Sequence, residues 1–407
     1  MKKNEIWGSG LSPFFVPDDF LPSHPTVKED LKTEVLIIGG GLSGLLCAYE
    51  LCKAGREVTV VTENTVADGA TRFSAGILFG DGGPELLRLK QTLGLRAGVE
   101  WYRTAGAALS QLEKILSDTG SRCDFTPRES FYYTSLPKSV SALREEYFLR
   151  HHMGLNCRWL GAEECAERFS FPCAGGILSR AGATFNPVKF GRDLTDWITL
   201  HGGAVFEGSR VESIERGDGE YRCRCNGYVL RAKKIVDARG GEVLRKRPAL
   251  GQRVTVFSIV TEPISVFRGW PEECLIKSRD EFSYLRTTPD GRILFSGEAS
   301  TALSPEGKIG SLDASPLCRV KYRNLEEDLQ EMFFGIPRVR KEYGFCQSLV
   351  IPKGGLPYVG RDPQWEGVYY LYAFGEGGLA GAILGSAWIY RMMESPTAQC
   401  PAFLNLP

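Results

Sequence analysis

EVLIIGGGLSG, residues 34–44, is the stretch of this 407-residue sequence that decides the fold. The apolar run 35–38 is typical of a parallel strand buried on both faces. Gly39, Gly41 and Gly44 have the spacing of a dinucleotide-binding turn. In order, they permit a tight turn, close approach of a pyrophosphate, and close packing of the next helix on the strand.

The residues that follow complete a strand–turn–helix–strand unit. Leu42 and Ser43 begin the helix, whose free N–H groups point at the phosphates, so both are candidate cofactor contacts. Residues 58–62 have the pattern of a second strand, and Glu63 follows them, 24 positions after Gly39. An acid there accepts hydrogen bonds from both ribose hydroxyls of an adenosine and disfavours a 2′-phosphate. FAD or NAD is therefore favoured over NADP, and the alternative is a βαβ unit with an incidental glycine turn.

The composition is that of a globular protein with two to three domains. Apolar residues make up 43% of the chain and charged residues 24%, and there are 49 basic and 49 acidic side chains. Because the charges balance, no overall field attracts nucleic acid or an acidic membrane. These classes of partner are not expected.

Neither a membrane-spanning segment nor a signal peptide is predicted, because no apolar run approaches about 18 residues and the N-terminus lacks an apolar core. We therefore expect a cytoplasmic protein whose 12 cysteines are reduced thiols. Cys223 and Cys225 are the closest pair, and we interpret them as apolar fillers on one face of a strand. With four histidines, at scattered positions, no metal site is predicted.

Two later glycine turns resemble the first in their context. The apolar strand 235–238 ends in Gly240, and strand 368–372 leads to Gly375, Gly377 and Gly378 before an apolar helix. Turns of this kind at strand ends can converge on one cofactor, and the last helix would also direct its N-terminus at a ligand. Three such turns favour a long cofactor, FAD, over NAD.

The remaining pattern predicts an α/β fold with two domains. A Rossmann-like FAD-binding domain with a parallel sheet takes residues 31–118, 175–247 and 343–400, and an α+β substrate domain takes 119–174 and 248–342. The substrate domain is expected to hold a mostly antiparallel sheet, and residues 1–30 an irregular, aromatic arm. Helices are predicted for the ranges 84–118, 140–152, 188–201, 325–334 and 379–393, and a hairpin turn at Asn226-Gly227.

Several motifs in this order resemble the D-amino-acid oxidase-like superfamily of FAD-dependent oxidoreductases, over residues 31–393. They are the turn 39–44, Glu63, the small-residue loop 71–76, Phe185-Asn186-Pro187, the segment 238–241, the segment 355–360 and the segment 374–378. The resemblance implies two domains with FAD buried in extended form and its flavin ring at their interface. It also implies hydride transfer to flavin N5 from a carbon that bears nitrogen.

By this resemblance, Gly39, Gly41, Gly44 and Glu63 hold the ADP half of FAD. The resemblance further places Thr71, Ser74 and Ala75 along the flavin and Val211 near the adenine. Gly375 to Gly378 would present N–H groups near the flavin's pyrimidine end, where reduction builds negative charge.

The sequence departs from the superfamily at the substrate side. Phe345, Gln347, Leu349 and Gly354 stand where the resemblance leads us to expect an aromatic-glycine motif, a carboxylate-binding arginine and an aspartate. The missing arginine argues against a simple α-amino acid, because a bidentate carboxylate clamp is hard to replace. Cys346 lies one position from the cysteine that carries the flavin in some relatives, so we expect the flavin to be non-covalent.

Tyr284 and Arg286 are the candidate catalytic residues, as neighbours on one face of a predicted strand. The alternatives are a core tyrosine and a surface arginine.

The leading hypothesis is an oxidase or dehydrogenase that acts on an amine or a modified amino acid. Its electron acceptor would be oxygen or another molecule. The protein could form a homo- or hetero-oligomer. A flavin-binding subunit that has lost catalysis is the second hypothesis, and a nicotinamide-only dehydrogenase is the third and least favoured.

Overall fold

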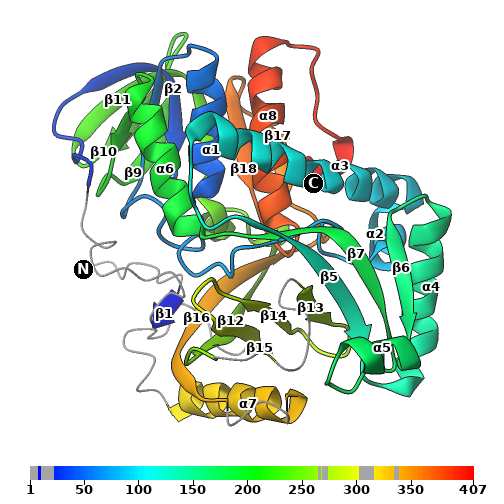
Figure 1. The fold of residues 1–407 in the computed structure, drawn as a ribbon. Helices are drawn as coiled ribbons and strands as arrows, with labels where there is room; N and C mark the ends of the chain where they lie inside the picture. Colours follow the sequence, from blue (N-terminus) through cyan, green and yellow to red (C-terminus); the bar gives the residue numbers. More distant parts are fainter. Residues whose placement is uncertain (1–7, 11–22, 265–266, 268–273, 302–315, 334–338) are drawn as a thin grey trace.

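The computed structural model describes residues 8–10, 23–264, 267, 274–301, 316–333 and 339–407. Within these residues the strands form two large sheets, which lie one above the other in Figure 1, with helices around the upper one. Most of the predicted N-terminal arm lies outside the described residues. The predicted fold class is confirmed.

The first sheet is the dinucleotide-binding sheet. Its strands are β2 (Leu31–Ile38), β3 (Val58–Val61), β8 (Ala204–Phe206), β9 (Val211–Arg216), β10 (Tyr221–Cys225), β11 (Tyr228–Asp237), β17 (Tyr358–Arg361) and β18 (Val368–Tyr372). Their order is β17-β18-β11-β2-β3-β8, and the five strands from β18 to β8 are parallel. In register, Ile38 of β2 lies between Asp237 of β11 and Val61 of β3. The carboxyl ends of these strands therefore meet at one edge, where parallel sheets of this class bind ligands.

Helices cover one face of this sheet and a hairpin covers the other. The helices of the chain are α1 (Leu42–Lys53), α2 (Leu86–Leu93), α3 (Leu95–Thr119), α4 (Val140–His152), α5 (Ala162–Arg168), α6 (Pro187–Leu200), α7 (Pro316–Met332) and α8 (Gly378–Glu394). Helix α1 is central, packed between α6 and α8, with α3 beside α8 (Figure 1). Buried side chains of β9 and β10 pack on the opposite face. The strand run 35–38 is accordingly buried on both faces, as predicted.

The second sheet is mostly antiparallel. Its strands are β1 (Gly8–Gly10), β4 (Ile77–Phe79), β5 (Thr126–Thr134), β6 (Cys157–Gly161), β7 (Gly175–Thr184), β12 (Gly251–Thr261), β13 (Cys274–Ser278), β14 (Tyr284–Thr287), β15 (Ile293–Ser300) and β16 (Lys341–Pro352). Their order is β1-β16-β12-β15-β14-β13-β5-β7-β4, with β6 on β7, and β13 and β5 form the parallel pair. Helices α5 and α7 contribute to the apolar cluster on one face, and α7 lies below the sheet in Figure 1.

The sheets divide the chain differently from the predicted domain bounds. Strands β4, β7 and most of β16 fall in the ranges 31–118, 175–247 and 343–400, yet all three belong to the second sheet. Strand β13 was not predicted at all. Sheet membership depends on pairing between distant segments, which a local apolar pattern does not reveal.

The local predictions stand, with changed boundaries. The predicted helix 84–118 is two helices, because Gly94, at φ 89°, ends α2 and starts α3 in a conformation that a helix cannot continue. Asn226 and Gly227 have φ values of 51° and 88°, which confirms the predicted hairpin turn. Helix α4 has its predicted bounds, while α7 begins nine residues before the predicted 325.

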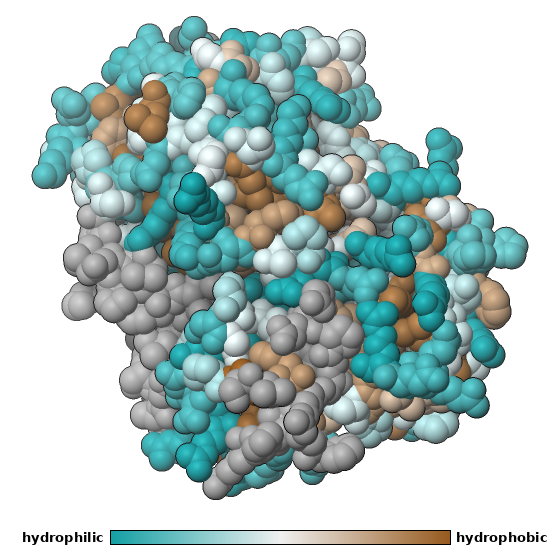
Figure 2. Space-filling view, viewed as in Figure 1, coloured by the Kyte–Doolittle hydropathy of each residue, from teal (hydrophilic) through white to brown (hydrophobic). Residues whose placement is uncertain are grey.

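The surface seen in Figure 2 is mostly hydrophilic, with apolar residues in separate patches and one patch in the middle of the view. In the described part of the chain, no helix has the length and apolar character needed to cross a membrane.

Candidate active site

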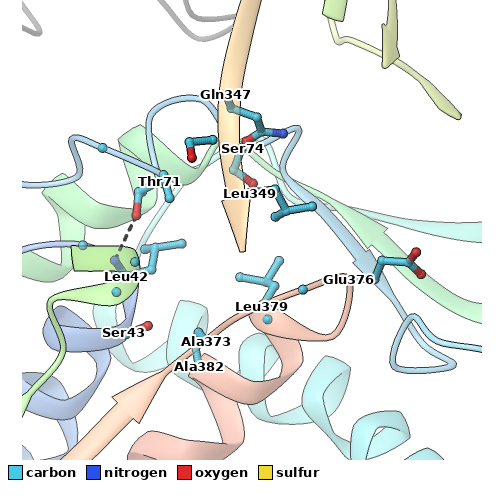
Figure 3. Close-up of a pocket in the computed structure, with 18 of the residues that line it drawn as sticks. Leu42, Ser43, Thr71, Ser74, Gln347, Leu349, Ala373, Glu376, Leu379 and Ala382 are labelled. Carbon is cyan, nitrogen blue, oxygen red and sulfur yellow. Dashed lines mark hydrogen bonds between the residues drawn. The ribbon is translucent and has the colours of Figure 1, made fainter. Parts of the chain in front are cut away.

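A cavity of about 520 Å³ lies at the edge where the parallel strands end. It is lined by residues of both sheets, from Glu63 and Val211 at one end to Tyr132 and Tyr284 at the other. Figure 3 shows part of its wall, with Thr71 and Leu42 on one side and Glu376 on the opposite side. The cavity is therefore bounded both by the dinucleotide turn and by the predicted substrate region.

The dinucleotide turn has the geometry predicted for it. Gly39 has φ 122°, and a Cβ there would lie 2.5 Å from the carbonyl oxygen of Ala238 on the neighbouring strand. Gly41 is the residue before α1 and, as a glycine, has no side chain with which to cap the helix. The Leu42 N–H donates to Thr71 Oγ1 at 3.1 Å, drawn as the dashed line in Figure 3, while Ser43 also lines the cavity. The N-terminus of α1 is thus open toward the cavity, which suits a diphosphate.

Gly44 and Gly377 were predicted as cofactor contacts, but neither lines the cavity. A Cβ on Gly44 would lie 1.9 Å from the Gly39 carbonyl oxygen, and one on Gly377 would lie 2.6 Å from that of Gly82. Both glycines allow close backbone packing behind the cavity wall. Gly240, Gly375 and Gly378 do line it.

The end of the cavity beside β3 carries the predicted adenosine residues. Glu63 and Val211 both line it, together with Arg210, whose Nη1 lies 3.4 Å from Glu63 Oε1. The side chain of Glu63 is 26% exposed, so its carboxylate is accessible from the cavity. Ribose recognition by Glu63 stays a prediction.

The small-residue loop lies along the middle of the cavity, where Thr71, Ser74 and Ala75 contribute to the wall. Arg286 lies behind this loop, is 1% exposed and does not line the cavity. Its Nη1 donates to the carbonyl oxygens of Ala75 at 2.8 Å and Gly76 at 3.0 Å. Burial lowers the pKa of Arg286 to about 9. We therefore correct the predicted catalytic role of Arg286: it cross-links the loop from behind, because its long side chain extends past the cavity wall.

Tyr284, in contrast, faces the cavity, together with Gln347 of β16. Gln347 Nε2 donates to the Tyr284 hydroxyl at 3.4 Å, and burial raises the pKa of that hydroxyl. Leu349 also lines the cavity (Figure 3). An apolar side chain therefore occupies the position at which the family resemblance predicts a carboxylate-binding arginine. The part of the wall formed by Tyr284, Gln347 and Leu349 is thus made of neutral polar and apolar groups.

The other altered positions of this stretch do not line the cavity. Phe345 is buried against Phe73, with ring centroids 6.3 Å apart, and Gly354 is also outside the wall. The Cys346 side chain belongs to the apolar cluster on the α7 face of the sheet, away from the cavity. This position gives Cys346 no access to a flavin in the cavity.

Charged residues elsewhere in the cavity wall were not predicted from the sequence. Lys277 pairs with Glu376 at 2.5 Å, and Arg279 pairs with Glu85 at 3.0 Å, all four in the cavity wall. Lys277 and Arg279 lie on or next to β13, the strand that was not predicted. Only Glu376 had a detectable signal, its place inside a glycine turn. Among the described residues no cluster of metal-binding side chains is present.

The strand end at Gly240 is held by a buried ion pair. Asp237 Oδ2 accepts from Arg239 Nη2 at 2.6 Å and from the Tyr372 hydroxyl at 3.1 Å. Burial acts to raise the pKa of Asp237, but Arg239 outweighs it, so the pKa lies below its usual value. Through Tyr372 the pair connects the end of β11 with β18, and Arg239 itself lines the cavity beside Gly240 and Gly241.

These features fit FAD. The N-terminus of α1, whose residues Gly41, Leu42 and Ser43 line the cavity, suits its diphosphate. Glu63 and Val211 suit its adenosine, and the loop of small residues suits a flat ring. Tyr284 and Gln347, the candidate substrate contacts, line the same cavity.

Comparisons with known proteins agree with this arrangement. Gamma-glutamylputrescine oxidoreductase of Escherichia coli (strain K12) is 21% identical over 400 residues, which cover 94% of this chain and 88% of that protein. A candidate Rieske 2Fe-2S iron-sulfur protein of Bacillus subtilis (strain 168) is 23% identical over 53% of this chain, and the match spans only 42% of that relative. The crystal structure of glycine oxidase from Geobacillus kaustophilus superposes with a TM-score of 0.76 at 17% identity, covering 93% of this chain and 99% of the other.

The family model described as DAO, FAD dependent oxidoreductase, matches residues 34–391. This match covers most of the chain, from the strand before the dinucleotide turn to the last helix. The chain therefore belongs to the DAO family of FAD-dependent oxidoreductases.

Proposed function

We propose that this chain oxidises a carbon–nitrogen bond of a small amine or of a modified amino acid. FAD, when bound, supplies the acceptor for the hydride that leaves the carbon next to nitrogen. The remaining tasks fall to the residues of the chain, which hold the substrate, orient it and exclude water.

The observation that carries this proposal is the continuity of the cavity. One space joins the dinucleotide turn at Gly39 to the wall formed by Tyr284 and Gln347. A substrate at these two residues would share one cavity with the cofactor. Close placement of two reactants is a large part of what such a site contributes to rate.

The wall around Tyr284 supports a substrate held by neutral hydrogen bonds. The Tyr284 hydroxyl and the Gln347 amide can each donate to or accept from a ligand. Leu349 is apolar, and Arg286 uses its guanidinium on backbone carbonyls behind the wall. We therefore propose an amine or an N-substituted amino acid whose binding does not depend on an arginine clamp for the α-carboxylate.

The experiment is an anaerobic panel followed by the absorbance of oxidised flavin near about 450 nm. The panel pairs each N-methyl or imino acid with its parent α-amino acid, and adds amines without a carboxylate. We expect a substituted compound or an amine to bleach the flavin faster than the matched α-amino acid. No bleaching across the panel, in a protein that dithionite reduces fully, would instead support a flavin-binding subunit without catalysis.

The acceptor, location and assembly belong to the same proposal. Oxygen uptake with the best substrate separates an oxidase from an enzyme that uses another acceptor. A cytoplasmic location is supported by the twelve cysteines, all of them free thiols. Cell fractionation tests the location, and sedimentation tests whether the protein is a homo- or hetero-oligomer.

A further inference from the structure

The ion pair of Lys277 and Glu376 lies in the wall of the cavity. Lys277 Nζ is 2.5 Å from Glu376 Oε2 and donates to the Gly83 carbonyl oxygen at 2.6 Å. The two side chains are only 16% and 26% exposed. Lys277 comes from β13 of the second sheet, whereas Glu376 comes from the glycine turn before α8. The pair therefore joins the substrate sheet to the cofactor side.

The position of the Lys277 charge is set by several contacts at once. Its Nζ lies 5.5 Å from the ring centroid of Phe79 and 5.2 Å from that of Tyr132, within the range of cation–π attraction. Gly83 packs directly on Glu376, since a Cβ at Gly83 would lie 2.6 Å from Glu376 Cβ. Both charges are thus held in place.

The pair lies at the end of the cavity that the flavin ring would take. The diphosphate site is at the N-terminus of α1, near Leu42 and Thr71, and Glu376 is on the opposite side of the cavity in Figure 3. Its neighbours Gly375 and Gly378 also line the cavity. FAD is a long molecule, so with its diphosphate at α1 and its adenosine at Glu63, the ring points toward this turn.

We infer that Lys277 and Glu376 set the reduction potential of the flavin as an opposed pair of charges. Reduction builds negative charge on the ring, so a nearby cation favours the reduced form and a nearby anion the oxidised form. In a partly water-excluded cavity these effects are larger than in water. Removal of the Lys277 charge should therefore lower the reduction potential, and removal of the Glu376 charge should raise it.

The test is a set of three variants, Lys277→Met, Glu376→Gln and the double variant. The potential of the FAD-loaded protein is measured by titration against a reference dye, without any substrate. We expect Lys277→Met to lower the potential and Glu376→Gln to raise it, each by at least tenfold in the two-electron equilibrium, which is about 30 mV. The double variant should return toward the wild-type value.

The second ion pair of the cavity is the matched control. Arg279 and Glu85 also lie in the wall, at 3.0 Å, but Glu85 precedes α2 and neither residue belongs to the cofactor turn. Arg279→Met and Glu85→Gln should change the equilibrium less than threefold. Shifts of the same sign in Lys277→Met and Glu376→Gln, or shifts no larger than those of the control pair, would overturn the inference.

A variant that loses FAD does not leave the question open. If Lys277→Met fails to bind FAD, the test compares Glu376→Gln with Glu376→Asp. The first variant keeps the size of the side chain, and the second keeps its charge. The inference requires a raised potential in the first and a value near wild type in the second. The inference depends on the cofactor only, so failure of the amine panel would leave this test unaffected.

Discussion

Arg286 shows how a single residue can be placed on the correct face and still be given the wrong role. Its alternation with Tyr284 put both side chains on the cavity side of β14. Tyr284 is short enough to stay in the wall, whereas the arginine extends to the backbone of the loop 75–76 and to Phe185. Side-chain length and the position of the loop decided the outcome, and neither can be read from the spacing of two residues.

Replacing Arg286 with Met should lower the free energy of unfolding by about 3 kcal/mol. The variant removes the donor of the Ala75 and Phe185 carbonyl oxygens, while the Gly76 oxygen keeps its bond from the Phe185 N–H. An unsatisfied buried group costs roughly 1 to 3 kcal/mol. Urea denaturation measures the change. Arg96→Met, at an exposed arginine on α3, is the control and should change stability by less than about 0.5 kcal/mol. Equal effects of the two variants would contradict the cross-link.

Replacing Tyr284 with Phe should lower kcat/KM about tenfold for the best substrate of the panel. The change removes one hydrogen-bonding hydroxyl, whose loss costs on the order of 1.4 kcal/mol at the transition state. Stopped-flow reduction of the flavin gives the rate, and the flavin spectrum reports cofactor binding, which should not change. An unchanged kcat/KM would mean that Tyr284 only forms part of the wall.

At the scale of elements, helix α1 and strand β2 must approach more closely than side chains normally allow. Gly44 makes that approach possible, although it does not line the cavity. Gly44, the third glycine of the motif, therefore serves helix packing, as predicted. It does not line the cavity, so it is not one of the residues placed to contact the cofactor. Helix α1 carries an apolar surface almost all round because α6 and α8 enclose it.

Replacing Gly44 with Ala should weaken FAD binding more than tenfold. A Cβ placed 1.9 Å from the Gly39 carbonyl oxygen forces the helix away from the strand and displaces the N–H groups that face the diphosphate. Equilibrium dialysis against FAD measures the affinity. Gly106→Ala on α3 is the matched control, because its Cβ would have 3.9 Å to the nearest atom, and its affinity should equal that of wild type.

At the scale of the whole molecule, two sheets share one cofactor. Residues from the first 80 positions, from the turn after β11 and from the last 65 positions line the same cavity. A ligand that contacts all of them binds only the folded chain, and so it stabilises the fold by mass action.

Removal of FAD should therefore lower the melting temperature, and addition of FAD should restore it. At a free concentration of 100 times Kd the expected stabilisation is about 2.7 kcal/mol. Thermal unfolding of the apo-protein with FAD, and with FMN as a control that lacks the adenosine, measures the effect. Equal protection by FMN would mean that Glu63 and Val211 do not hold an adenosine.

The predictable part of the site is the part made by continuous stretches. The turn 39–44 and Glu63 were predicted from spacing and residue type, and the loop 71–75 from the family resemblance, because each of these groups of residues lies within one short segment. The place of Lys277 and Arg279 in the cavity wall could not be predicted, because β13 has only five residues and pairs with β5, which is far away in the sequence. A lone lysine on a short strand has no pattern that separates it from a surface charge.

By itself the sequence determined the family, the dinucleotide-binding unit, the preference for FAD and most helices and strands. These features depend on local conformation: positive φ at Gly39, a continuous apolar run in 35–38, and a helix that starts where the glycines end. Only the tertiary structure decided which side chains line the cavity. It placed Tyr284, Gln347, Lys277 and Glu376 around one space and turned Arg286 behind it, because contact between distant strands depends on sheet register and side-chain reach.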